Sequence, residues 1–367
     1  MSARLDRAEI PARTALAALA VAIFFFLHAA VPVAQAWARA AAFFGDAVLR
    51  LPQRPLTLVA PDPRVSELTW ANDGRGQLTL PGGDGPHPGL VVVLGARAAS
   101  PDDPRVVRLT DGLARIGFAV LLPKSDDLDG GRVVPAEIDR LVAAQQALSA
   151  RPTVKQDRVG FIGLSAGGSL TIVAAAHPAI RDTTWFVLAI GPYYDARDLV
   201  AETVSGTYRD VDGSGVGWEP RAITKEVVRE TLLAALGADD RAAVEGGRAA
   251  GSAGGRAVAD LLAGMELERA RALIATLPPA EAASLAAISP RDALHGLRAP
   301  LYLMHDRSDP FIPLPHSELL VRAHRPAVFH RTEIFEHVDP KITSVGPLLR
   351  DGWRMHRLFV RILLDGR

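Results

Sequence analysis

Short apolar runs alternate with longer amphipathic segments through most of the chain. The apolar runs predict eight strands, at 65–70, 76–80, 90–94, 118–122, 159–164, 185–190, 301–304 and 328–335. Segments of helical periodicity lie between and after them, at 105–116, at 135–148, directly after Ser165 and at 353–364. Strands that alternate with helices form a parallel sheet covered on both faces. The pattern predicts an α/β fold with a mostly parallel sheet of about eight strands. The first two strands, within 65–80, are predicted to form a hairpin.

The alternation stops between Tyr193 and Pro290, where the pattern contains no strand-like run. Helical segments are predicted there at 223–236, 256–276 and 280–287, with a Gly/Ala-rich stretch at 237–255. We interpret 195–289 as a helical cap that divides the core into 52–194 and 290–367. Open α/β sheets bind ligands at the carboxyl ends of their strands, so we expect the cap above that edge. The alternative is a helical insertion that takes no part in binding.

The first 51 residues carry a separate pattern. Arg4, Arg7 and Arg13 precede the apolar run 15–27, which is typical of a membrane-targeting segment. Residues 14–37 could cross a bilayer, which takes ~20 helical residues, and Ala34-Gln-Ala36 could instead end a cleaved signal peptide.

We favour an uncleaved, hydrophobic N-terminal helix as the anchor, because residues 37–50 predict an amphipathic stretch at the membrane interface. An ordinary surface helix is the alternative for this stretch. The domain that follows is expected outside the cytoplasm, either anchored to the membrane or exported after cleavage.

Composition excludes several classes of protein. Lys+Arg and Asp+Glu are both 41, so the net charge is zero and nothing favours a nucleic-acid partner. Cysteine is absent, which excludes disulfides, thiolate catalysis and cysteine-bound zinc. The sequence contains no His-Glu-x-x-His, no P-loop and no Gly-x-Gly-x-x-Gly motif, so we expect no metal or cofactor.

The pentapeptide Gly163-Leu164-Ser165-Ala166-Gly167 joins a predicted strand to a predicted helix. A serine on so sharp a turn needs neighbours without bulk two residues before and two after it, and both are glycine here. The pattern predicts a nucleophile elbow with Ser165 as the nucleophile. A neutral serine also needs a base, a carboxylate that orients the base, and donors for an oxyanion.

Carboxylates and histidines follow the last two predicted strands. Asp306 and Asp309 come after the strand at 301–304, and His337 comes after the strand at 328–335. Side chains in such loops reach the same edge of the sheet as Ser165. The order Ser, Asp, His along the chain is the one found in enzymes that have a nucleophile elbow. Other histidines of this region are rivals for the base, but an isolated histidine is more often a core or surface residue than a catalyst, and only His337 combines a loop after a strand with this chain order; the rivals are His305, His316, His324, His330 and His356.

From about Val65 to Leu364 the chain resembles the α/β-hydrolase superfamily, in its dienelactone-hydrolase-like and prolyl-oligopeptidase-like branch. In that branch the strand before the acid usually ends His-Gly-x-x-Asp, followed by an apolar residue and proline. Here the segment reads His305-Asp306-Arg307-Ser308-Asp309-Pro310. The resemblance implies Asp309 as the acid and His337 as the base. Asp306 replaces the usual glycine and is a rival acid.

The resemblance also implies an oxyanion hole made of two backbone N–H groups. One belongs to Ala166 after the nucleophile, and the other to Ala96 or Arg97 in the loop after the third strand, with Ala96 preferred. This loop departs from the frequent His-Gly form. Arg97 is either a contact for an acidic substrate group or a solvated arginine. Tyr193 and Tyr194 either line the pocket or pack beneath the cap.

These features together predict a serine hydrolase that acts on a small-molecule carboxylic ester through an acyl-enzyme. One alternative is a peptidase of the prolyl-oligopeptidase type, although the propeller domain and specificity acids of that type are not recognisable. Another is a membrane-tethered binding protein that kept the fold and lost the chemistry. The pattern leaves the oligomeric state open.

Overall fold

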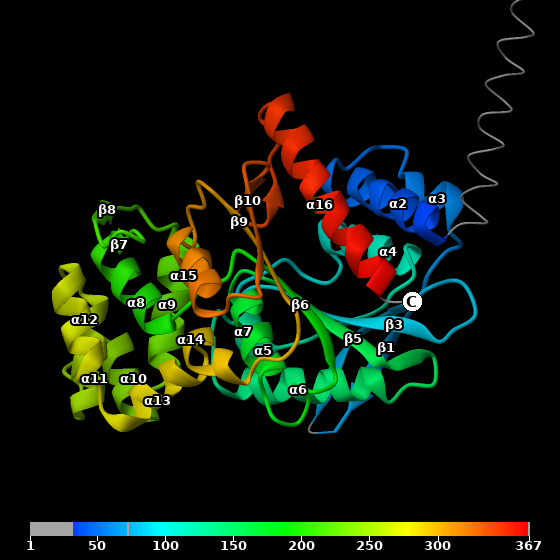
Figure 1. The fold of residues 1–367 in the computed structure, drawn as a ribbon. Coiled ribbons are helices and arrows are strands. Elements are labelled where there is room, and N and C mark those ends of the chain that lie inside the picture. The colour runs from blue at the N-terminus through cyan, green and yellow to red at the C-terminus, as the bar shows by residue number, and fades with distance from the viewer. Residues whose placement is uncertain (1–31, 72, 366–367) are drawn as a thin grey trace, which may run out of the picture.

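The computed structural model describes residues 32–71 and 73–365, and its centre is an eight-stranded sheet (Figure 1). The strand order is β1-β2-β4-β3-β5-β6-β9-β10, in which β1 and β2 are antiparallel and every pair from β4 to β10 is parallel. The strands are β1 Arg64–Trp70, β2 Gly74–Leu80, β3 His87–Val93, β4 Ala119–Pro123, β5 Val154–Leu164, β6 Thr184–Ile190, β9 Leu301–Asp306 and β10 Val328–Thr332. All eight predicted strands and the first hairpin are confirmed.

Helices cover both faces of the sheet, because successive side chains of each strand point to opposite faces. In β3, Val91 and Val93 lie in the core that α6 and α7 cover, whereas Leu90 and Val92 lie in the core that α4 and α16 cover. The helices of the sheet domain are α4 Pro104–Arg115, α5 Asp126–Asp129, α6 Ala136–Ser149, α7 Ala166–Ala175, α14 Pro290–Ala293, α15 Pro315–Ala323 and α16 Val345–Asp365, with the 3-10 helix η2 at Leu294–Gly296.

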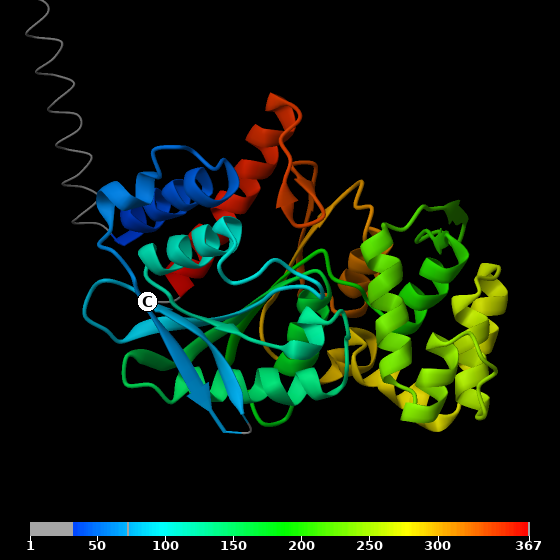
Figure 2. The same ribbon diagram turned by 180° about the vertical axis from the view of Figure 1, so that it is seen from behind.

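The cap between β6 and β9 is helical, as the sequence predicted, and lies beside the sheet (Figure 2). Gly264, at φ +83°, ends α11 and splits the predicted helix 256–276 in two. Helix α10, inside the Gly/Ala-rich stretch, and the hairpin of β7 and β8 were not predicted. The cap elements are α8 Ala196–Ser205, β7 Thr207–Arg209, β8 Gly215–Gly217, α9 Ala222–Ala234, α10 Ala238–Glu245, α11 Ala253–Leu262, α12 Leu267–Ala275 and α13 Pro279–Ala287.

A small helical unit precedes the sheet and packs against α16 and α4 (Figures 1 and 2). It consists of α2 Pro32–Phe43, the π-helix η1 Phe44–Val48 and α3 Pro55–Val59. The stretch 37–50, which we expected at a membrane interface, instead buries its apolar face: Phe43 is 3% exposed and packs on Phe359 with ring centroids 4.8 Å apart.

A buried carboxylate also fixes this unit. Asp46 accepts two hydrogen bonds of 3.1 Å from Arg54 and forms an ion pair of 3.3 Å with Arg108 of α4. Residues 32–51 therefore pack as part of the sheet domain and do not form a separate segment. The apolar run 15–27 lies outside the described residues, and no helix within 32–71 or 73–365 is long and apolar enough to span a bilayer.

Candidate active site

Ser165 occupies the sharp turn between β5 and α7. Its backbone has φ 56° and ψ −131°, which a residue with a side chain rarely adopts. The turn is possible because Gly163 and Gly167 have no side chain. A Cβ on Gly163 would come within 2.5 Å of the Gly167 carbonyl oxygen, and one on Gly167 within 2.5 Å of the Leu94 carbonyl oxygen. The geometry is that of a nucleophile elbow.

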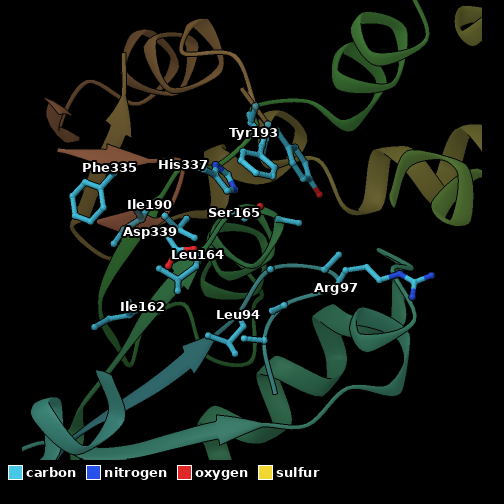
Figure 3. Close-up of a pocket in the computed structure, with 18 of the residues that line it drawn as sticks. Leu94, Arg97, Ile162, Leu164, Ser165, Ile190, Tyr193, Phe335, His337 and Asp339 are labelled. Carbon is cyan, nitrogen blue, oxygen red and sulfur yellow. The ribbon is translucent and has the colours of Figure 1, made fainter. Parts of the chain in front are cut away.

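His337 and Asp309 are hydrogen-bonded, with 2.6 Å between Nδ1 and Oδ2. Asp309 lies just past β9. His337, at φ 60°, lies in the turn of a two-stranded hairpin made of β11 Phe335–Glu336 and β12 Asp339–Pro340. The predicted strand 328–335 therefore ends at Thr332, and its last residue belongs to this hairpin. Figure 3 shows Ser165 and His337 reaching into one cavity, from the end of β5 and from the hairpin.

The carboxylate of Asp309 is buried and ionised. Burial alone would raise its pKa, but the charge of His337 and hydrogen bonds from His305 and His337 outweigh burial and hold the pKa well below its usual range. Its Oδ1 accepts hydrogen bonds from the N–H groups of Phe311 at 2.8 Å and Ile312 at 3.0 Å. An ionised carboxylate only accepts hydrogen bonds, so Nδ1 of His337 donates to it, and in the neutral imidazole this tautomer has its lone pair on Nε2.

The rival acid Asp306 is occupied elsewhere. Its Oδ1 accepts from the N–H and the hydroxyl of Ser308, each at 3.0 Å, and burial raises its pKa. The rival base His305 lies behind Asp309, with Nε2 at 3.3 Å from Oδ2 and Nδ1 at 2.7 Å from the Ser317 hydroxyl. The structure thus joins His337 to Asp309 and not to Asp306. His305 contacts the carboxylate of Asp309 and does not take the place of the base.

Two contacts that the sequence did not reveal hold the imidazole of His337. The Phe311 ring stacks on it, with centroids 4.7 Å apart and planes inclined by 23°. Gly191, directly after β6, has φ +63°, and a Cβ there would lie 3.0 Å from Cε1 and 3.1 Å from Nδ1 of His337. The N–H of Ser165 donates to the carbonyl of Ile190 at 2.7 Å, so the end of β6 contacts both residues.

The structure separates the two amides considered for the second oxyanion donor. The N–H of Arg97 donates to the carbonyl of Leu128 at 2.8 Å, so it is not available to a ligand. The N–H of Ala96 remains, beside Gly95, where a Cβ would lie 3.2 Å from Ser165 Oγ. Ala166 begins α7, and the first N–H groups of a helix have no partner within it. Ala96 and Ala166 both line the cavity at Ser165.

The cavity around Ser165 has a volume of about 400 Å³, which is within the range of small-molecule sites. Tyr193 lines it and is buried, with its hydroxyl donating to the Ile288 carbonyl at 2.9 Å. Tyr194 does not line it, and its N–H donates to His316 Nδ1 at 3.2 Å. Arg97 lies at the edge of the cavity and pairs with Glu226 of the cap at 2.7 Å (Figure 3).

Within 32–71 and 73–365, no group of three or more His, Asp or Glu side chains is arranged to hold a metal ion. The sheet order, the elbow after β5 and the two loops that bring Asp309 and His337 together define the α/β-hydrolase fold. The resemblance seen in the sequence is therefore confirmed at the level of the fold.

Comparison with known proteins finds similarity among solved structures. No protein-family model and no curated protein matches the chain. The structure of DcsB with its substrate analogue is similar at 12% identity and a TM-score of 0.50, over 83% of this chain and 100% of that one. Dienelactone hydrolase from Anabaena variabilis is 16% identical with a TM-score of 0.42, over 82% of this chain and 99% of that one.

A peptidase is also among the similar structures. Porphyromonas gingivalis dipeptidyl peptidase 4 is 14% identical with a TM-score of 0.49, and the match covers 84% of this chain. This chain spans only 36% of the length of that peptidase. At identities this low the likeness concerns the fold, and the reaction has to be argued from the site.

Proposed function

We propose that this chain is a serine hydrolase that cleaves carboxylic esters with Ser165, His337 and Asp309. The observation that carries the proposal is the strained Ser165 in the same cavity as an imidazole that a buried, ionised Asp309 orients. Nε2 of His337 takes the proton of Ser165 as Oγ attacks the ester carbonyl. The imidazolium then returns the proton to the leaving alcohol, and water hydrolyses the acyl-enzyme by the same steps.

The N–H groups of Ala166 and Ala96 are proposed to stabilise the oxyanion that forms during each attack. Their side chains are irrelevant to this role, because the donors belong to the backbone. Asp309 remains ionised and keeps Nδ1 of His337 protonated, so that Nε2 acts as the base. No metal or cofactor takes part in these steps.

The lining of the cavity favours an ester over a peptide. The acidic residues along it, among the described part of the chain, are Glu336 and Asp339. Glu336 pairs with Lys341 at 2.8 Å and with Arg221 at 3.3 Å. Asp339 pairs with Arg105 at 3.0 Å and Arg50 at 3.2 Å. Carboxylates that are already paired offer little to the free N-terminal ammonium group that an aminopeptidase binds, whereas apolar walls suit an uncharged ester.

Labelling with a fluorophosphonate probe tests the nucleophile, and short p-nitrophenyl esters and matched anilides test the bond that is cleaved. We expect the wild type to be labelled and to hydrolyse the esters faster than the anilides. Ser165→Ala should abolish labelling and lower kcat by at least ~10³-fold with its fold intact. Ser66→Ala, an exposed serine on β1, is the matched control and should behave as the wild type. Labelling that persists in Ser165→Ala contradicts the assignment.

We also propose that the full chain associates with a membrane through its N-terminal segment. The support is the apolar run 15–27 behind Arg4, Arg7 and Arg13. An anchored protein should stay with the membranes after a carbonate wash, because ~20 buried apolar residues outweigh surface electrostatics. A cleaved signal peptide predicts a mature N-terminus near Trp37. Full-length protein that the wash releases contradicts the anchor.

A further inference from the structure

The cavity at Ser165 continues on both sides of the sheet edge. On one side its walls are Tyr193 and the cap, with Val200 from α8 and Val228 from α9. On the other side the cavity runs between the sheet and the N-terminal helical unit, and we call this part the N-terminal arm. The walls of the N-terminal arm come from η1, α2, α4 and α16: Phe43, Ala47, Val48, Val106, Met355 and Phe359.

The alternation of side chains in β5 and β6 explains why the N-terminal arm is separate from the space under the cap. Ile162 and Leu188 line the cavity and belong to the same core as Phe43 and Phe359. Tyr193 and Val200 belong to the other core, on the α7 side of the sheet. In Figure 3, Ile162 and Leu164 lie along one strand below Ser165, as residues two apart on a strand do. Ser165 therefore stands between two apolar compartments.

The outer part of the N-terminal arm carries charged side chains that form ion pairs. Asp339 bridges Arg50, which follows η1, and Arg105 of α4. The side chains of these three residues are between 37% and 53% exposed, so they mark the rim towards solvent. Inside the rim the walls are aliphatic and aromatic. An interior of this kind binds an uncharged apolar chain and rejects a charged one.

We propose that the N-terminal arm binds an extended apolar chain of the substrate, so that the substrates are esters that carry a long alkyl chain. The inference rests on the proposed ester hydrolysis and adds the class of substrate to it. The carbonyl lies at Ser165, the alkyl chain runs between the sheet and the N-terminal helical unit, and the other part of the ester lies under the cap. Each methylene that the N-terminal arm buries should raise kcat/KM by about fourfold until the space is filled.

A bulky side chain in the N-terminal arm tests the inference. Ala47 of η1 lines the cavity and is half-buried, whereas Ala41 of α2 is exposed and does not line it. Ala47→Trp and Ala41→Trp therefore add the same volume inside and outside the N-terminal arm. The substrates are two series of esters, p-nitrophenyl esters of rising acyl length and acetates of rising alcohol length.

We expect Ala47→Trp to lower kcat/KM at least about tenfold for the longest members of one series, through the loss of two or more buried methylenes. The shortest esters should change less than threefold, because their reaction does not use the N-terminal arm. Ala41→Trp should match the wild type throughout. If Ala47→Trp lowers kcat/KM by the same factor at every length in both series, the inference is wrong. Should the tryptophan variant fail to fold, Ala47→Leu is expected to shift the preferred length by a smaller step.

Binding without hydrolysis separates this inference from the proposed function. Ser165→Ala should still bind an uncharged, fluorescently labelled ester with a long alkyl chain, and the added Ala47→Trp change should weaken that binding at least about tenfold. Binding that persists unchanged overturns the role of the N-terminal arm whatever the reaction is. If Ala47→Trp blocks binding but the wild type hydrolyses no ester, the role of the N-terminal arm in binding stands and the proposed function is wrong.

Discussion

Gly191 offers a test of how closely activity depends on the position of the His337 imidazole. In Gly191→Ala the added Cβ would lie 3.0 Å from Cε1, 3.1 Å from Nδ1 and 3.4 Å from Asp309 Oδ2. Contacts of 3.0 and 3.1 Å are closer than such atoms prefer, so the imidazole must shift by a few tenths of an ångström. The backbone at φ +63° adds about 1–2 kcal/mol of strain for a residue with a side chain.

A displacement of a few tenths of an ångström should lower kcat by about 3- to 10-fold, because a misplacement of ~1 Å can cost ~10²-fold. The matched control is Gly247→Ala. Gly247 has φ +66°, and a Cβ there would meet nothing within 4 Å. Both variants therefore carry similar backbone strain, and only Gly191→Ala touches His337.

Steady-state kinetics on a short p-nitrophenyl ester, together with thermal unfolding, separate strain from displacement. We expect both variants to lose similar stability and only Gly191→Ala to lose kcat. A kcat for Gly191→Ala within twofold of the wild type refutes the reasoning. So does an equal loss of activity in Gly247→Ala, since the cause would then be strain alone.

Three further predictions concern the acid, the pH dependence of stability and the N-terminal helical unit. Asp309→Asn should lower kcat by ~10²-fold or more and Asp306→Asn by less than tenfold, measured on the same ester. Burial lowers the pKa of His316, and protonation of Nδ1 would give up the hydrogen bond from the Tyr194 N–H, but the charge of Glu202 at 3.0 Å and of nearby aspartates raises the pKa above 6.5. This stabilisation is present below pH 6.5 and lost as the pH rises through the raised pKa, so thermal unfolding of the Glu202→Gln variant should depend less on pH in that interval. Phe43→Ala should lower the free energy of unfolding by about 3–5 kcal/mol in denaturant titrations, and a loss below 1 kcal/mol would contradict the packing of α2.

The parts of the fold that the sequence predicted are those that local pattern determines. Each strand of the sheet is a short apolar run, and the elbow needs small residues at fixed positions around Ser165, so both can be recognised from neighbours in sequence. The acid was harder to predict, because Asp306 and Asp309 follow the same strand. The structure distinguishes them through the hydrogen bond between Asp309 and His337, two residues that are 28 positions apart.

The contacts that position the imidazole could not be predicted from pattern. Gly191 reads as a turn after a strand, and its close approach to His337 depends on how β6 lies beside β9 in the sheet. Phe311 reads as one of two apolar residues between Pro310 and Pro313, and its stacking on His337 requires the hairpin of β11 and β12. One signal was available for the hairpin. The segment 335–340 contains Glu336 and Asp339 and ends in Pro340, a composition that does not suit a strand inside the sheet.

The amphipathic stretch 37–50 shows why one face of a helix does not identify its partner. An apolar face has the same pattern whether it lies on a bilayer or on another helix, and here it packs on α16 and α4. The consequence reaches the site, because Arg50 pairs with Asp339, two residues after His337 on the same hairpin. The segment that sequence pattern separates from the sheet domain therefore provides both a wall of the cavity and a contact to the hairpin that carries His337.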